Sequence, residues 1–114
     1  MKNTVSLNRN YDFLRLYKKG RSFVAGMVVL YVLPNRRGQK RLGITASKKI
    51  GGAVIRVRAR RVLKEAYRSL EDCIPNGQDI VLVSRMRTPE CKSHEVAAQL
   101  RRLLDEAGVL KKAI

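Results

Sequence analysis

The chain has 114 residues, 45% of them hydrophobic, and a formal net charge of +16 at pH 7. This length fits one domain, residues 1–114, and the apolar content excludes a disordered basic tail. No apolar run approaches the roughly 20 residues of a membrane span, and the first residues lack the apolar stretch of a signal peptide, so we expect a cytoplasmic protein without a membrane partner.

The chain is predicted to start with a short helix over residues 9–19. Its apolar side chains recur at helical spacing, and either Asn8 or Asn10 can cap its N-terminus. Gly20 stands where a helix commonly ends, just past the last periodic residue. We therefore expect one amphipathic helix before the first strand.

Two strands are predicted to follow this helix. Residues 22–33 are rich in β-branched and apolar side chains, which indicates a buried strand that Gly26 can split in two. Residues 41–46 form the next strand. Because residues 34–38 leave only a short turn between them, we expect these strands to run antiparallel.

The second half is predicted to alternate between helix and strand. A basic, glycine-containing connector over residues 47–52 leads into a helix over 53–70, and residues 79–84 form a strand. A last helix starts at Ser93 as its cap and ends at Gly108. The order α-β-β-(β)-α-β-α predicts an α+β fold, a two-layer α-β sandwich with helices packed on one mixed sheet.

The net charge is concentrated in one part of the chain. Residues 1–64 contain 17 lysines and arginines and one acidic residue, Asp12, whereas residues 65–114 contain eight residues of each sign. A cationic surface with so few acids to pair it is typical of a protein that binds a polyanion. We infer that the N-terminal half provides a nucleic-acid contact surface.

The helix over 53–70 is predicted to separate its charges from its apolar side chains. Its packed face contains Ile55, Ala59, Val62, Leu63 and Ala66, and the opposite face contains Arg60, Arg61, Lys64 and Arg68, with Arg58 at the border. Like charges four residues apart each cost a few tenths of a kcal/mol, and Glu65 alone can offset them. Phosphate groups would relieve this repulsion, but the pattern does not choose between RNA and DNA.

Residues suited to catalysis are scarce. The single histidine, His94, follows Ser93 at a predicted helix start, and no glycine-rich phosphate loop is present. Cys73 and Cys91 lack a Cys-x-x-Cys partner, which favours two reduced thiols over a disulfide or a zinc site. If the protein takes part in catalysis, we expect another component to supply the chemistry.

Residues 48–65, Lys-Lys-Ile-Gly-Gly-Ala-Val-Ile-Arg-Val-Arg-Ala-Arg-Arg-Val-Leu-Lys-Glu, resemble the signature of the protein component of bacterial ribonuclease P. That signature is a lysine-rich connector with glycine, followed on a helix by Ala-Val-x-Arg-Asn-Arg-x-(Lys/Arg)-Arg. Residues 12–22, 29–31 and 43–49 resemble the first helix, a strand and the start of the connector in the same family. The resemblance therefore covers most of the chain.

The resemblance implies a subunit of a ribonucleoprotein endonuclease that removes the 5′ leader from precursor tRNA. In this family the RNA subunit carries the active site and its Mg²⁺ ions, so no catalytic residue, directly bound metal or small-molecule substrate is expected in the protein. The implied partners are the catalytic RNA and precursor tRNA with its leader. The implied fold is an α-β sandwich with a left-handed βαβ crossover, an exception to the usual handedness.

The resemblance also implies two groups of binding residues. Those expected to contact the catalytic RNA are Lys48, Lys49, Arg56, Arg58, Arg60, Arg61, Lys64 and Arg68. Those expected to line a central cleft for the single-stranded leader are Phe13, Tyr17 and Tyr31, because aromatic faces stack on unpaired bases of any sequence. Core packing is an equally good interpretation of each aromatic residue.

Three other functions compete with this interpretation. A general RNA-binding protein or RNA chaperone, associated with ribosomal or other structured RNA, would show no dependence on a 5′ leader. A self-sufficient nuclease would cut precursor tRNA without any RNA subunit. A DNA-binding helix-turn-helix is disfavoured because the basic helix follows a strand and a connector, where that motif requires another helix.

The sequence departs from the family pattern in two places. Ala25-Gly26 stands where many relatives carry a polar and a basic residue, and Val57 stands at the signature asparagine. A valine side chain cannot form a hydrogen bond, so we expect weakened catalytic assistance with RNA binding retained. Neither position belongs to an apolar face, so the fold is expected to be unaffected.

The variant Val57→Asn tests this expectation. Restoring a hydrogen-bonding side chain should raise the turnover of the reconstituted holoenzyme at low Mg²⁺, measured as the rate of precursor-tRNA cleavage. Unchanged turnover would show that the loss of the amide has no cost in this protein.

Overall fold

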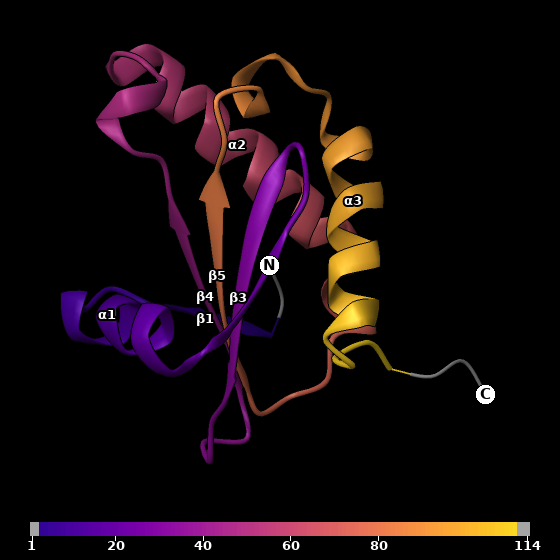
Figure 1. The fold of residues 1–114 in the computed structure, drawn as a ribbon. Coiled ribbons are helices and arrows are strands. Elements are labelled where there is room, and N and C mark those ends of the chain that lie inside the picture. Colours follow the sequence, from indigo (N-terminus) through magenta and orange to yellow (C-terminus); the bar gives the residue numbers. More distant parts are fainter. Residues whose placement is uncertain (1–2, 112–114) are drawn as a thin grey trace.

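The computed structural model describes residues 3–111. Five strands form one mixed sheet in the order β1-β4-β5-β3-β2, with three α-helices packed against it (Figure 1). The strands are β1 Thr4–Ser6, β2 Arg21–Val24, β3 Val28–Pro34, β4 Lys40–Thr45 and β5 Gln78–Ser84. The helices are α1 Asn10–Lys19, α2 Ala53–Leu70 and α3 Ser93–Glu106, with short 3₁₀ turns η1 Lys48–Ile50, η2 Glu71–Cys73 and η3 Thr88–Glu90. Within this part of the chain, no helix is both long and apolar enough to cross a membrane.

Strand β5 occupies the centre of the sheet, between β3 and β4. It runs antiparallel to β3 and parallel to β4, so β3 and β4 do run in opposite directions, but β5 lies between them. The physical reason is burial: Ile80, Val81 and Leu82 are all fully buried, so both faces of β5 must be covered. A strand of this kind belongs in the interior of a sheet.

The long apolar segment after α1 is split at Gly26, as predicted, into the antiparallel hairpin β2–β3. The Ala25 N–H donates to the Val28 carbonyl oxygen at 2.9 Å and closes the turn. Strand β1 was not predicted. It pairs in parallel with β4 but contains only three residues, of which Val5 and Ser6 are exposed, so it has no recognisable apolar alternation.

The ends of α1 differ from the expected caps. Arg9 is the N-cap residue and makes no side-chain cap hydrogen bond, so neither Asn8 nor Asn10 has the predicted role. Gly20 does end the helix, but with an ordinary negative φ of −74°. A side chain there would place its Cβ 2.6 Å from the Leu16 carbonyl oxygen, so the position requires glycine for close approach and not for a left-handed turn.

The N-terminus of α3 also differs by one residue from the prediction. Lys92 is the N-cap, and Ser93 is the first helical residue. The Lys92 backbone N–H donates to a Glu95 carboxylate oxygen at 2.9 Å. The side chain of the third helical residue thus provides a partner for the N–H of the N-cap residue. Gly108 follows the helix with a φ of +73°, as expected for a C-terminal glycine.

The helices cover both faces of the sheet unequally. Helices α2 and α3 pack on one face and bury the main core, which includes Leu63, Tyr67, Leu100 and Leu104. Helix α1 covers part of the other face, where Leu16 packs with Leu7 and Val81. Figure 1 shows α1 and α3 on opposite sides of the sheet. The α+β sandwich is confirmed, with α1 added on its second face.

The connection from β4 through α2 to the adjacent parallel strand β5 is a βαβ crossover. In Figure 1 both strands point upward, and the chain passes around α2 on the helix side before it returns to β5. Viewed from that side, β5 lies to the left of β4, so the crossover is left-handed, as the family resemblance implies. Most crossovers of this type are right-handed.

A buried ion cluster ties α1 to the sheet. The Arg41 guanidinium donates from Nε and Nη2 to the two Asp79 carboxylate oxygens at 2.7 and 2.6 Å, and its Nη2 lies 3.5 Å from an Asp12 carboxylate oxygen. Asn35 Nδ2 also donates to Asp79 at 2.7 Å. Burial works to raise the pKa of Asp79, but the hydrogen bonds from Arg41 and Asn35 outweigh burial and hold this pKa below its ordinary value.

The variant Arg41→Met should strongly destabilise the protein, because it leaves the Asp79 carboxylate buried without its partner. We expect the free energy of unfolding, measured by urea denaturation at pH 7, to fall by about 3–5 kcal/mol. Arg36→Ala, in an exposed bend, should change the free energy of unfolding by no more than about 0.5 kcal/mol.

The depressed pKa of Asp79 also predicts how stability depends on pH. The contribution of the ionised Asp79 to the free energy of unfolding should be complete above about pH 4 and lost as pH falls through the folded-state pKa. Equal acid sensitivity in the wild type and in Arg41→Met would contradict this role.

Candidate RNA interface

Helix α2 presents a continuous basic face to solvent. Arg58, Arg60, Arg61, Lys64 and Arg68 are exposed, whereas Ala59 and Leu63 on the other side are fully buried. The predicted amphipathic division is therefore confirmed, except that Ile55 is 39% exposed because it precedes the packed part of the helix. The described residues of α2 form one ion pair, Glu65 with Arg68 at 3.6 Å, so most of these positive charges are not neutralised within the protein.

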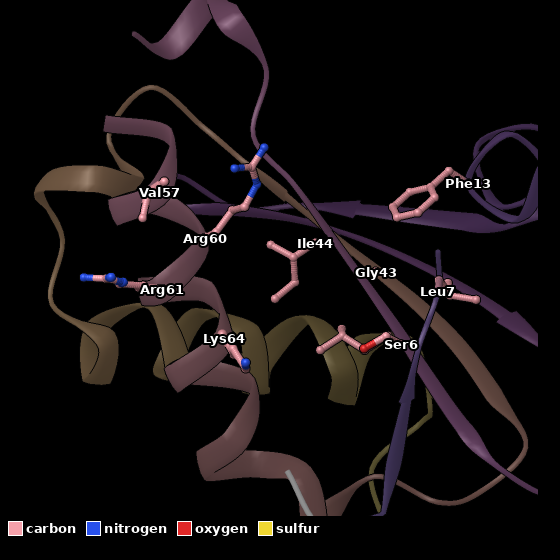
Figure 2. A pocket seen from close by; sticks show the side chains of 10 residues that line it. Ser6, Leu7, Phe13, Gly43, Ile44, Val57, Arg60, Arg61 and Lys64 are labelled. Atoms are coloured by element: carbon pink, nitrogen blue, oxygen red, sulfur yellow. The ribbon is translucent and has the colours of Figure 1, made fainter. Parts of the chain in front are cut away.

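A groove runs between α2 and the β1–β4 edge of the sheet. One part has a volume of about 350 Å³, with Gly43 and Ile44 of β4 among its lining residues (Figure 2). Residues of α2 line it on one side, namely Val57, Arg60, Arg61 and Lys64, and Ser6, Leu7 and Phe13 line it on the other. Figure 2 shows the Arg60 side chain directed along β4, whereas Arg61 extends away from the groove.

The groove continues along α1 into a second hollow of about 370 Å³. The two hollows share Phe13, Ile44 and Arg60, and the second adds Asn10, Tyr17 and Thr45. We refer to both together as the central groove. The structure thus brings two of the three predicted cleft aromatics together with a predicted RNA-binding arginine.

The Phe13 ring lies against the backbone of β4. A Cβ atom on Gly43 would be 2.6 Å from two carbon atoms of this ring, so only glycine leaves room for it. This role of Gly43 was not predicted, although a glycine inside a strand commonly marks such a close approach. Gly43 therefore sets the position of the ring in the groove.

Tyr17 and Tyr31 form an edge-to-face pair beside the groove. Their ring centroids are 4.9 Å apart at an interplanar angle of 74°. Tyr17 is 40% exposed and lines the groove, while Tyr31 is half-buried behind it and lies against the smaller core cluster. Burial raises the pKa of the Tyr17 hydroxyl, and a hydrogen bond with Thr45 opposes this shift. Tyr31 thus supports Tyr17 more than it forms the groove wall.

The remaining predicted RNA-binding residues lie outside the central groove. Lys48 and Lys49 are exposed in η1, before α2 begins, and Arg68 is exposed near the end of α2. Arg58 lines an adjoining depression of about 410 Å³ with Val54, and this depression shares Val57 and Arg61 with the groove. Arg56 is half-buried, and within the described chain its Nε has no hydrogen-bond partner. These residues extend the basic surface before the start of α2, over its first turns and, at Arg68, to its last turn.

Groups suited to metal or acid–base chemistry are not assembled in the described residues. No group of three or more His, Cys, Asp or Glu side chains there could hold a metal ion. His94 is exposed on α3 and is not among the residues that line the central groove, and Cys73 and Cys91 are free thiols. The groove itself offers arginine, lysine, hydroxyl and aromatic groups, which bind phosphates and bases.

The profile of the ribonuclease P protein family, described as Ribonuclease P, matches residues 1–108. The chain belongs to this family. The ribonuclease P protein component of Clostridioides difficile is 35% identical over 107 residues, with 93% of this chain and 94% of that protein covered. The component from Natranaerobius thermophilus is 33% identical over 114 residues, with 100% and 99% covered.

Solved structures of ribonuclease P proteins share this fold. The Staphylococcus aureus protein superimposes with a TM-score of 0.80 and 31% identity, covering 93% of this chain and 97% of that one. The Thermotoga maritima protein gives 0.78 and 30%, covering 89% and 96%. The chain is therefore a protein subunit of the ribonuclease P holoenzyme, which removes 5′ leaders from precursor tRNA, and its partner is the RNA subunit.

The variant Gly43→Ala should show how tightly the Phe13 ring is held. The added methyl group overlaps the ring, and we expect it to lower the free energy of unfolding by about 1–3 kcal/mol. Urea denaturation measures this change. Combining Gly43→Ala with Phe13→Leu should recover part of the loss, because the smaller side chain leaves space for the methyl. Additive losses in the double variant would mean that the ring is not the obstacle.

Proposed function

We propose that this subunit holds the single-stranded 5′ leader of precursor tRNA in the central groove and contacts the catalytic RNA through the basic face of α2. The observation that carries this proposal is the placement of Phe13, Tyr17 and Arg60 around one groove. Stacking surfaces and a cation at one site match the chemistry of an unpaired RNA strand, which offers bases and phosphates together.

The groove chemistry accounts for binding leaders of any sequence. An aromatic face stacks on every base, which contributes about 1–3 kcal/mol per base, and Arg60 and Lys64 on the opposite wall attract phosphates without reading sequence. Val57, 42% exposed beside them, provides only apolar contact. The leader is thus recognised as single-stranded RNA and not by its base order.

The basic face of α2 brings two polyanions together. Catalytic RNA and precursor tRNA repel each other, and a subunit with a net charge of +16 screens this repulsion where they meet. Six phosphate contacts would give a log–log salt slope of roughly −4 to −5, and more contacts a steeper one, so affinity should fall sharply over a few-fold rise in salt.

We assign the Mg²⁺ ions that support cleavage to the RNA subunit. The described residues of this chain offer no carboxylate cluster that fits the oxygen coordination Mg²⁺ prefers. The protein's own contribution is to orient the leader and to neutralise phosphates, which would lower the ion concentration required. We also place the protein in the cytoplasm, where precursor tRNA is made.

A second activity is suggested by one similar structure, described as a Staphylococcus aureus RNase P protein mutant with defective mRNA degradation activity. In this chain the groove lining contains neither histidine nor carboxylate, so it lacks a general acid–base pair. Hydrolysis of mRNA by the purified protein, free of any RNA subunit, would establish a nuclease of its own. An RNA chaperone remains the alternative if binding proves independent of the leader.

The decisive experiment is reconstitution with a bacterial ribonuclease P RNA. Precursor-tRNA cleavage at low Mg²⁺ should be fast with the protein and slow without it. In the same assay, Phe13→Ala should weaken holoenzyme affinity for precursor tRNA by roughly 5- to 150-fold, the equivalent of about 1–3 kcal/mol for one lost base stack.

The controls separate leader binding from general effects. Affinity for mature tRNA without a leader should be the same for the wild type and for Phe13→Ala. Arg101→Ala, an exposed site on α3, should behave as the wild type with both RNAs. An equal loss of affinity for precursor and mature tRNA would show that the leader does not bind in the central groove.

A further inference from the structure

Several arginines lie outside both α2 and the central groove. A hollow of about 270 Å³ beside the N-terminal end of α1 is lined by Arg9, Arg37 and Arg41, together with Ser6, Tyr11 and Asp12. A neighbouring hollow of about 390 Å³ is lined by Arg15, Arg36 and Arg37 with Pro34 and Asn35. We call these two the arginine hollows. None of their arginines belongs to the predicted RNA-binding set.

The arginine hollows adjoin the central groove. Ser6 lines both the groove and the first hollow, and Arg37 lines both arginine hollows. Shared lining residues therefore link four depressions in one series, from Tyr17 past Phe13 and around the N-terminal end of α1. A flexible strand that leaves the groove at Ser6 would enter the first arginine hollow directly.

The charge of the hollows is largely uncompensated. Asp12 is the only acid in their lining, and it lies 3.5 Å from Arg41, which is also paired with Asp79. In the described part of the chain, Arg9, Arg36 and Arg37 have no carboxylate within ion-pair distance. Arg36 and Arg37 are exposed in the bend after β3, free to meet a phosphate.

The first hollow also offers a stacking surface. The Tyr11 side chain is 71% exposed although it is aromatic, and it lines the hollow with Arg9. The N-terminus of α1 at the same place makes no side-chain cap hydrogen bond. The Asp12 N–H donates to the Arg9 carbonyl oxygen at 3.0 Å, which leaves the earlier N–H groups of Asn10 and Tyr11 as donors at this end of the helix. An exposed ring between unpaired arginines repeats the chemistry of the central groove.

We propose that the arginine hollows bind the distal part of the 5′ leader, the single-stranded RNA that continues out of the central groove past Ser6. This inference rests on the proposed function of the groove. The path bends around the end of a helix, which a flexible single strand can follow and a stiff duplex cannot. Continuity with the groove favours the leader over the catalytic RNA as the occupant.

The test compares two precursor tRNAs, one with a short leader that ends inside the groove and one with a long leader. Holoenzyme affinity for each is measured with the wild type, with Arg36→Ala/Arg37→Ala, and with Arg101→Ala/Arg102→Ala. The last is a matched pair of adjacent, exposed arginines on α3. Urea denaturation of each variant confirms that the fold is retained.

We expect the Arg36→Ala/Arg37→Ala variant to lose affinity for the long-leader precursor by about five- to tenfold at physiological salt. Its log–log salt slope should become shallower by about 1.4, the value for two phosphate contacts with a single strand. Affinity for the short-leader precursor should equal that of the wild type, and the α3 pair should change neither value.

Three results would overturn the inference. Equal losses for short and long leaders, or no loss for either, would show that the distal leader does not reach the arginine hollows. Weaker binding of this variant to the RNA subunit alone would assign the hollows to the catalytic RNA. Phe13→Ala distinguishes a failure of the groove itself: if it weakens both precursors while Arg36→Ala/Arg37→Ala weakens neither, the groove function stands and only the extension fails.

Discussion

The buried ion pair between Arg41 and Asp79 fixes the geometry on which the rest of this molecule depends. It joins β4 to the central strand β5, and through Asp12 it reaches the first turn of α1. Helix α1 carries Phe13 and Tyr17, and β4 carries Gly43 and Ile44, so this cluster sets the distance between two walls of the central groove. Charges buried in this way are costly unless fully paired, and the bidentate geometry provides that pairing.

Most of the fold could be predicted from apolar periodicity, and the exceptions have physical reasons. Long segments with strong patterns, such as residues 53–70, form the elements they predict. Strands β3 and β4 run antiparallel, as predicted, but the position of β5 between them was not predicted, because it depends on the burial of both faces of a strand that comes much later in the chain. Strand β1 was missed because three residues, two of them exposed, carry no alternation.

Site residues were predicted where their side-chain type indicates their role. They were missed where the role depends on close contact with a residue distant in the sequence. Arginines at helical spacing and the aromatic pair Phe13 and Tyr17 could be identified from residue type, spacing and family resemblance. The role of Gly43 depends on a ring from another element, thirty positions earlier in the chain, which no local pattern reveals. Ser6 and Thr45 became part of the groove lining only through the parallel register of β1, β4 and β5.

The strand order also dictates when this protein can fold during its own synthesis. Two of the strand pairings, β3 with β5 and β4 with β5, require β5. This strand follows residues 1–64, which carry the net charge, and so leaves the ribosome after them. Until then the strongly cationic first half has no interior strand to assemble on. A nascent polycation next to ribosomal RNA can bind it non-specifically, and the late synthesis of the central strand lengthens the time in which this can happen.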